Sequence, residues 1–328
     1  MKLAMIGSYG HANVVLNGWK ETDDLELVAA ARWGPDDPMG YVGSLAPPEV
    51  PVFDDYRDML DEAAPDVVGV FMPFSRMAEA SIAAVERGCH VFSEKPLATT
   101  LDDLSRLKRA AAGAGVEVAA CLALRGAPAF RTIRQAVQDG RIGEVVYATA
   151  QKSYPFHQRD EFYASRETYG GTIPWVAIHA IDFLRCCTGL DYVRVAAVAS
   201  NRAHPSRPGM EDQGALLAEL SNGGAAAIHF DYLRPWGAHQ RPWGDDRLRI
   251  AGAAGVIETK DCGAAVELIT PDATEMLALA PARNLFADFI AGLRGGGEGL
   301  ISTADSFRAT EVALKARDAQ DIGVFIDV

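Results

Sequence analysis

The sequence predicts an α/β protein of two domains, the first a doubly wound parallel sheet and the second an α+β domain with a large, mainly antiparallel sheet. At 328 residues the chain is long enough for two hydrophobic cores. Its first part alternates short apolar strands with amphipathic helices, which is typical of a parallel sheet. After Leu122, strand-like runs follow one another with glycine-containing turns between them, which favours antiparallel pairing.

The first domain is expected over residues 1–122. Its strand candidates are residues 2–6, 25–31, 67–72, 90–93 and 116–122. The clearest helix between them covers residues 76–87 and stops at Gly88, a residue type that tolerates the left-handed conformation after a helix. Another helix begins after Thr100, with Asp103 three residues on as a capping partner.

The second domain is expected over residues 123–328. A helix fits residues 128–139, with Pro128 in its first turn. Strand candidates follow at residues 144–152, 192–201, 214–220, 225–232, 247–251, 256–260 and 265–269. A closing helix is predicted at about 302–320.

Composition excludes several classes of function. The net charge of −13 argues against a nucleic-acid partner, because phosphate contacts need a basic surface. No run approaches the ~20 apolar residues of a membrane span, and the N-terminus reads as a strand, so a cytoplasmic protein is expected. The five cysteines show no metal-binding spacing, so no metal site is predicted.

A glycine-containing turn follows the first strand and opens a helix, which predicts dinucleotide binding in a Rossmann domain. Its residues are Gly7, Ser8, Tyr9, Gly10, His11 and Ala12. The match to G-x-G-x-x-G/A is incomplete, because Tyr9 replaces the second glycine and Gly10 comes one residue late. A plain strand-to-helix turn is the alternative.

The end of the second strand bears on the choice of cofactor. An acidic residue there usually accepts hydrogen bonds from the ribose of NAD, but this chain has Arg32. An arginine can clamp a 2′-phosphate and stack on adenine. Arg32 therefore favours NADP over NAD, and a solvated surface arginine is the alternative.

The segment Ser93-Glu94-Lys95-Pro96, after the strand at 90–93, resembles the E-K-P signature of the Gfo/Idh/MocA family, the relatives of glucose–fructose oxidoreductase and inositol dehydrogenase. Other segments look like landmarks of that family along almost the whole chain. They are Pro73, Arg125-Gly126-Ala127-Pro128, the segment 140–145, Gly170-Gly171 and Ile178-His179-Ala180-Ile181-Asp182.

The resemblance implies NAD(P)-dependent oxidation of a hydroxyl on a sugar, cyclitol or related polyol. It implies that Lys95 lies near the nicotinamide and the reacting hydroxyl, that His179 is a general acid or base, and that Pro73 and Glu94 help to hold the cofactor. Hydride removal leaves an alkoxide-like oxygen, which a cation stabilises and whose proton a base must accept. A homodimer or homotetramer is implied as well.

Helical spacing places Trp175, His179 and Asp182 on one face of a helix. A buried core histidine is the alternative for His179, and Asp182 either orients His179 or is a buried structural partner. Relatives often carry an aspartate where this chain has Trp175, whose indole suits stacking on a sugar ring. Together with Tyr9, Arg32 and Phe74, which follows Pro73, this makes four departures from the family pattern.

Polar and aromatic residues of the second domain supply further candidates for the substrate site. They are Tyr154, His157, Arg159, Tyr163 and Arg166, with Arg234, Trp236, Arg241 and Trp243 in a later stretch. Aromatic rings beside arginines suit a sugar or an acidic substrate, although ordinary surface loops look similar. We take Tyr154, Arg159, Trp175 and Asp182 as the substrate-binding candidates.

Three functions remain open from the sequence. The first is a dehydrogenase in which Lys95 and His179 handle the charge and the proton. The second is a redox-neutral enzyme that uses the same cofactor to cleave a glycoside. The third is a non-catalytic sugar or nucleotide sensor, which the four departures would favour and the retention of Lys95 and His179 disfavours.

Overall fold

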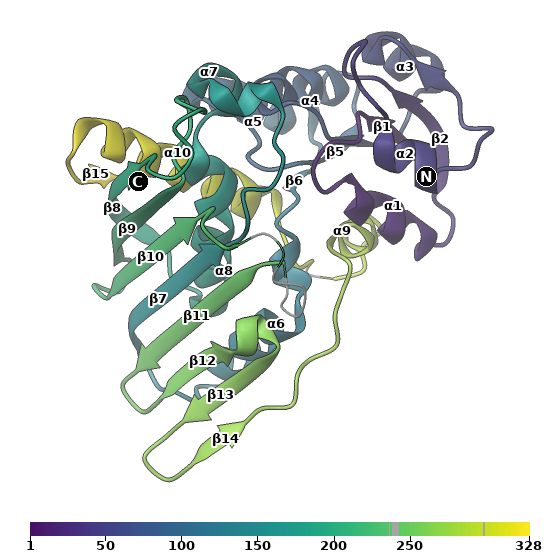
Figure 1. Ribbon diagram of the computed structural model, residues 1–328. Coiled ribbons are helices and arrows are strands. Elements are labelled where there is room, and N and C mark those ends of the chain that lie inside the picture. Colours follow the sequence, from purple (N-terminus) through teal and green to yellow (C-terminus); the bar gives the residue numbers. More distant parts are fainter. Residues whose placement is uncertain (236, 238–242, 298) are drawn as a thin grey trace. The chain divides into compact units, whose positions relative to one another are not determined.

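A computed structural model of the chain describes residues 1–235, 237, 243–297 and 299–328 (Figure 1). The chain divides into two compact units. The first comprises Met1–Ala123 with Arg283–Thr310, and the second Leu124–Ala282 with Glu311–Val328. The chain thus returns to its first unit after completing the sheet of the second, and helix α10 (Thr303–Ile322) starts in one unit and ends in the other.

The first unit contains a six-stranded parallel sheet in the order β3-β2-β1-β4-β5-β6 (Figure 1). Its strands are β1 (Lys2–Ile6), β2 (Glu26–Ala31), β3 (Val52–Phe53), β4 (Val67–Val70), β5 (His90–Ser93) and β6 (Val118–Ala120). This confirms the predicted doubly wound sheet. The strand order reverses between β1 and β4, and ligands of such sheets bind outside the carboxyl ends of the strands at that point.

Helices connect and flank these strands. They are α1 (Ala12–Lys20), α2 (Gly40–Leu45), α3 (Tyr56–Ala63), η1 (Phe74–Arg76), α4 (Met77–Val85), α5 (Leu101–Ala114) and α9 (Leu285–Leu293). Helix α9 packs on α1, and its N-cap Asn284 donates to the carbonyl oxygen of Val14 at 3.0 Å. The start of α10 covers the edge strand β6, because the amides of Val118 and Ala120 donate to the hydroxyls of Thr303 (2.9 Å) and Ser306 (3.1 Å).

The second unit contains a nine-stranded mixed sheet in the order β14-β13-β12-β11-β7-β10-β9-β8-β15 (Figure 1). Its strands are β7 (Val145–Ser153), β8 (Tyr192–Ser200), β9 (Gln213–Leu220), β10 (Ala225–Asp231), β11 (Asp245–Gly252), β12 (Val256–Lys260), β13 (Ala265–Ile269), β14 (Thr274–Met276) and β15 (Ile326–Asp327). Strands β7 and β10 pair in parallel and the other neighbours are antiparallel. The mainly antiparallel sheet is therefore confirmed.

Helices α6 (Pro128–Gln138) and α8 (Ile178–Thr188) pack against each other and against this sheet. The rings of Phe130 and Phe183 stack between them at 4.3 Å. The shorter elements of the unit are η2 (Ala123–Gly126), η3 (Glu161–Ala164), α7 (Arg166–Tyr169), η4 (Ile173–Ala177) and η5 (Asp261–Gly263), of which η2 starts at the last residue of the first unit.

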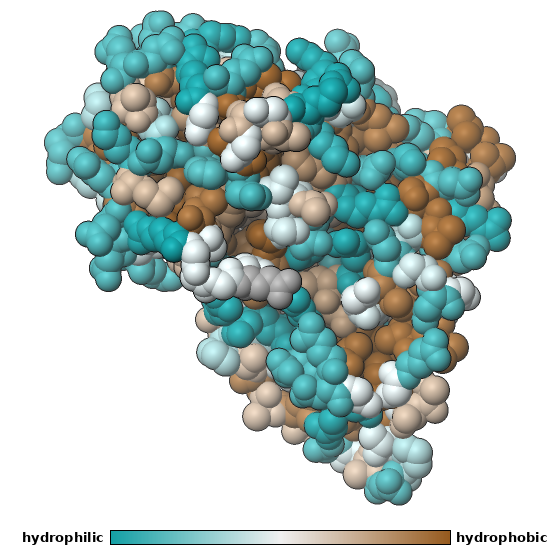
Figure 2. Space-filling model, turned by 180° about the vertical axis from the view of Figure 1, so that it is seen from behind, coloured by the Kyte–Doolittle hydropathy of each residue, from teal (hydrophilic) through white to brown (hydrophobic). Residues whose placement is uncertain are grey.

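The surface is largely polar on the side shown in Figure 2, where apolar residues form patches between hydrophilic ones. Among the residues that the structure describes, no helix is both long enough and apolar enough to cross a membrane.

The capping contact predicted for α5 is present, and it supplies a test of the fold. The Asp103 amide donates to Thr100 Oγ1 at 3.1 Å, and the Thr100 hydroxyl donates to Asp103 Oδ2 at 2.8 Å. We expect Thr100→Ala to lower the free energy of unfolding by about 1 kcal/mol, because two helix-end groups lose their partners. Urea unfolding followed by circular dichroism measures the change. Thr100→Ser keeps the hydroxyl and is the control, and equal losses in both variants would contradict the explanation.

Candidate functional site

The turn after β1 is built around Gly7. Its φ is +69°, and its amide donates to the carbonyl oxygen of Ala31 at 2.8 Å. A Cβ at this position would lie 2.3 Å from the carbonyl oxygen of Phe71, so a side chain does not fit. The Tyr9 amide donates to that same oxygen at 2.9 Å. The turn is therefore fixed between the ends of β2 and β4.

Gly10 explains the irregular spacing of the glycine motif. Its φ is +61°, and a Cβ there would lie 2.1 Å from Oε2 of Glu94. Glycine is needed here because the turn approaches the Glu94 carboxylate. That carboxylate accepts hydrogen bonds from the His11 amide (2.6 Å) and lies 2.9 Å from His11 Nδ1.

Glu94 and Lys95 follow β5, and both side chains are fully buried. The Lys95 amide donates to Glu94 Oε1 at 2.9 Å, and the Lys95–Pro96 peptide bond is cis. Burial by itself raises the pKa of the Glu94 carboxyl, but His11, Lys95 and the His11 amide outweigh burial and hold that pKa below its usual value. Glu94 is therefore an ionised carboxylate that ties the turn to Lys95.

The start of α1 has features that fit the pyrophosphate of a dinucleotide. Helix α1 begins after His11, whose side chain does not cap it, so its first N–H groups remain available to an anion. The Ser8 hydroxyl oxygen beside them is buried and has no hydrogen-bond partner among the described residues. A phosphate oxygen would satisfy both kinds of donor.

Two departures from the family pattern contact each other. The ring of Tyr9 meets that of Phe74 edge to face at 5.9 Å, and Phe74, which follows Pro73, is fully buried. An aromatic pair thus occupies two of the positions at which the sequence departs from the pattern that it resembles.

Arg32 directly follows β2, with its side chain 38% exposed. Its Nη1 donates to the carbonyl oxygen of Asp37 at 2.7 Å, and its Nε lies 3.7 Å from the Asp54 carboxylate. The Asp37 carboxylate accepts hydrogen bonds from the amides of Trp33 (3.0 Å) and Met39 (2.9 Å). The Asp37 carboxylate is therefore engaged in holding the loop, and Arg32 is the charged side chain directly after the strand.

In the second unit, His179 lies in the first turn of α8 and is 6% exposed. Trp175, 3% exposed, lies in the preceding π-helical segment η4. A π-helix closes its hydrogen bonds over five residues instead of four, so the helix predicted through Trp175 and His179 is π-helical in its first turn and α-helical from Ile178. Single π turns occur frequently at functional sites.

Asp182 forms a buried ion pair with Arg125. The Nε of Arg125 lies 2.9 Å from Asp182 Oδ2, and its Nη2 lies 2.7 Å from Oδ1. Both side chains are at least 95% buried. This two-pronged contact links helix α8 to the start of the unit.

Tyr154 and Arg159 belong to an aromatic cluster. The guanidinium of Arg159 lies 5.7 Å from the ring of Tyr154, 5.5 Å from that of Tyr163 and 5.4 Å from that of Tyr232. The Tyr163 ring meets Trp175 edge to face at 6.4 Å. The second unit therefore brings Arg159, Tyr163, Trp175 and the His179 helix into one neighbourhood.

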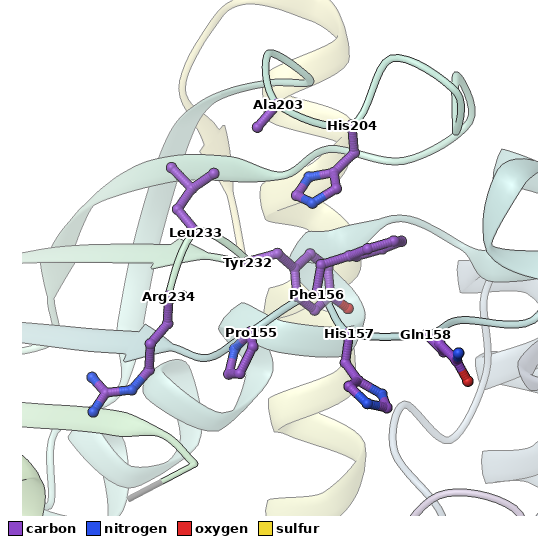
Figure 3. Close-up of a pocket in the computed structure, with 9 residues that line it drawn as sticks. All are labelled: Pro155, Phe156, His157, Gln158, Ala203, His204, Tyr232, Leu233 and Arg234. Carbon is purple, nitrogen blue, oxygen red and sulfur yellow. The ribbon is translucent and has the colours of Figure 1, made fainter. Parts of the chain in front are cut away.

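A pocket of about 540 Å³ adjoins this cluster (Figure 3). Its walls include Phe156, His204, Tyr232 and Arg234. Figure 3 shows the ring of Phe156 beside Tyr232, and their centroids are 5.6 Å apart. Arg234 is paired with Asp245 at 3.6 Å. Of the other candidates in this stretch, Trp243 is half exposed, whereas Trp236 and Arg241 lie outside the described residues.

Sequence reasoning missed how these residues pair. The contacts of Glu94 with His11, of Asp182 with Arg125, and of Tyr9 with Phe74 join residues 57 to 83 positions apart. The contact between Glu94 and His11 could have been inferred from the sequence, because a carboxylate at the end of one strand and a histidine in the turn after another strand lie at the same edge of a parallel sheet. Tyr232 gave no such signal, because it looks like an ordinary strand residue.

Comparison with known proteins identifies the family of both units. Residues 1–121 match the model of the "Oxidoreductase family, NAD-binding Rossmann fold", and residues 130–258 match the "GFO/IDH/MocA C-terminal domain". A putative oxidoreductase of known structure from Thermotoga maritima is 32% identical, with both chains covered in full and a TM-score of 0.94.

Two characterised relatives are more distant. The chain is 29% identical to 1,5-anhydro-D-fructose reductase from Ensifer adhaerens over 245 residues, 72% of this chain and 71% of that protein. It is 24% identical to D-apiose dehydrogenase from Paraburkholderia graminis, over 98% of this chain and 89% of the relative. With an NAD-binding Rossmann unit and a matching C-terminal domain, this chain belongs to the Gfo/Idh/MocA family of oxidoreductases.

Proposed function

We propose that this oxidoreductase transfers a hydride between a nicotinamide cofactor and a hydroxyl of a sugar-like polyol, with Lys95 and His179 as its catalytic residues. The observation that carries the proposal is the Glu94 carboxylate, which accepts hydrogen bonds both from the His11 amide, in the turn after β1, and from the Lys95 amide, after β5. A cofactor bound at the turn and a cation beside the reacting oxygen are the two requirements of this chemistry.

The cofactor, when bound, accepts or donates the hydride. We assign its pyrophosphate to Gly7, Ser8, Tyr9, Gly10, His11 and Ala12, with Pro73 and Glu94 as supporting residues. The Lys95 ammonium stabilises the negative charge that develops on the substrate oxygen. His179 takes up or returns the hydroxyl proton at Nε2, because its Nδ1 is shielded from solvent.

The second unit supplies the substrate contacts in this proposal. Trp175 offers an indole for stacking on a sugar ring, and Tyr154 and Arg159 offer an aromatic face and a cation. Asp182 acts through Arg125, by holding the α8 helix that carries His179.

Replacing either catalytic residue tests the mechanism. We expect Lys95→Ala and His179→Ala each to lower kcat by roughly 10²-fold or more, because charge stabilisation or proton transfer is lost. Steady-state rates of reduced nicotinamide formation over a panel of sugars and polyols measure the effect, and circular dichroism verifies folding.

Lys108→Ala and His229→Gln, at exposed positions, are the matched controls and should retain wild-type turnover. Unchanged turnover in both Lys95→Ala and His179→Ala would contradict the proposed mechanism. Release of an aglycone from glycosides without net reduced nicotinamide would instead identify the redox-neutral reaction.

We propose NADP as the preferred cofactor. Arg32 directly follows β2, and the Asp37 carboxylate is already bonded to two loop amides. A guanidinium at this place matches a 2′-phosphate in charge and in its fork of donors.

The Arg32→Ala variant tests this preference. We expect its kcat/KM for NADP to fall about 10- to 100-fold, because one charge-assisted hydrogen bond is lost. Its kcat/KM for NAD should change little. Kinetics with both cofactors in wild type and variant measure the ratio. Wild-type protein that prefers NAD, or a variant that loses both cofactors equally, would contradict the proposal.

Glu94 gives a prediction for pH. Its pKa is lower in the folded protein than the ordinary value of about 4.3, so its stabilising contribution is complete above that value. The contribution is lost as the pH falls through the folded pKa. The difference in free energy of unfolding between wild type and Glu94→Gln should therefore be largest above about pH 5 and shrink as the pH falls. Urea titrations from pH 7 downwards measure it, and a difference that stays constant with pH would refute it.

A further inference from the structure

We propose that the substrate carries a carboxylate group and that Arg159 binds it. The natural substrate would then be a polyhydroxy acid, such as a uronate or an aldonate. This inference rests on the function proposed above and narrows its substrate class.

Among the described residues, the guanidinium of Arg159 is surrounded by aromatic rings and has no anionic partner. Three tyrosine rings, those of Tyr154, Tyr163 and Tyr232, lie within 5.7 Å of it. Its Nε is buried without a hydrogen-bond partner among the described residues. The described residues also place no carboxylate within ion-pair distance of this side chain.

The tyrosines do not neutralise this cation. Burial raises the pKa values of Tyr154 and Tyr232 well above the usual range, so both are uncharged phenols at neutral pH. The ring faces attract a cation, but a ring face does not take the in-plane hydrogen bonds of a guanidinium, which has five N–H donors.

The carboxylates near this cluster have other cationic partners. Glu211 is paired with Arg166 at 2.8 Å, and Asp246 with Lys152 at 2.8 Å. Glu161 lies 3.3 Å from Arg207. Within the part of the chain that the structure describes, Arg159 therefore has no counter-charge, although the sequence has 44 acidic side chains and 31 lysines and arginines. A largely buried cation without a counter-charge is costly, so an anionic ligand is the expected partner.

The position of Arg159 suits a substrate that also reaches His179. Tyr163 contacts both Arg159 and Trp175, and Trp175 precedes the His179 helix by one π turn. Arg159 also contacts Tyr232, a wall residue of the pocket in Figure 3. The planar fork of a guanidinium binds a carboxylate through two parallel hydrogen bonds.

The charge at this position favours a carboxylate over a phosphate. A carboxylate carries one negative charge, which one guanidinium balances. A phosphate monoester carries close to two at neutral pH, and the neighbouring cations Lys152, Arg166 and Arg207 are already paired.

The test compares substrates that differ only at one carbon. D-glucuronate is paired with D-glucose, D-galacturonate with D-galactose, and D-gluconate with D-glucitol, with D-glucose 6-phosphate as the phosphate arm. We expect at least one acid to have a kcat/KM 10-fold or more above that of its neutral partner. Arg159→Gln should remove that advantage, so that the acid and its neutral partner reach about the same kcat/KM, because the charged hydrogen bond to the carboxylate is lost.

Arg159→Lys keeps the positive charge but lacks the planar pair of donors. Its preference for the acid over the neutral partner should therefore lie between those of wild type and Arg159→Gln. Arg194→Gln removes an exposed arginine of the same unit and should keep the wild-type ratio. A preference for every neutral partner, a preference for the phosphate, or an acid preference unchanged in Arg159→Gln would each overturn the proposal.

Calorimetry with the same compounds separates this inference from the proposed function. Acid binding that Arg159→Gln abolishes, without any nicotinamide-linked turnover, would support the carboxylate site and reject hydride transfer. Turnover of neutral sugars with no acid binding would reject the carboxylate site and leave hydride transfer in place.

Discussion

The buried carboxylate of Glu94 is the contact on which the proposed cofactor site of the first unit depends. It accepts hydrogen bonds from His11 and from the Lys95 amide, and it requires a residue without a side chain at Gly10. A buried charge is stable only when cations and donors compensate it. The turn after β1 and the backbone of the proposed catalytic lysine are therefore held by the same charge.

Contacts in the structure explain several departures from the family pattern that the sequence alone does not explain. Tyr9 and Phe74 pack on each other, so one replacement accommodates the other. Gly10 comes late in the motif because its close approach is to Glu94. These are local repackings that leave Ser8 and the start of α1 free for an anion. They weaken the argument for a sensor that has lost its cofactor site.

Hydrophobic periodicity was sufficient to predict most of the fold. Strands β12 and β13 begin and end at the predicted residues, because alternation and flanking turns define them. Strands β3 and β15 have two residues each, too few for a pattern. The π turn at Trp175 and the Arg125–Asp182 pair were not predictable, because both depend on tertiary contacts that no local spacing records.

The return of residues 283–310 to the first unit has a consequence for biosynthesis. When the ribosome has completed β6, the amides of Val118 and Ala120 at the edge of the sheet have no cover. Their partners, Thr303 and Ser306, are translated 185 and 186 residues later. Throughout that interval the nascent sheet presents an open edge, to which another strand can pair. A fragment cut after residue 122 would carry this edge permanently, so aggregation of such a fragment would not reflect a failure of the sheet itself.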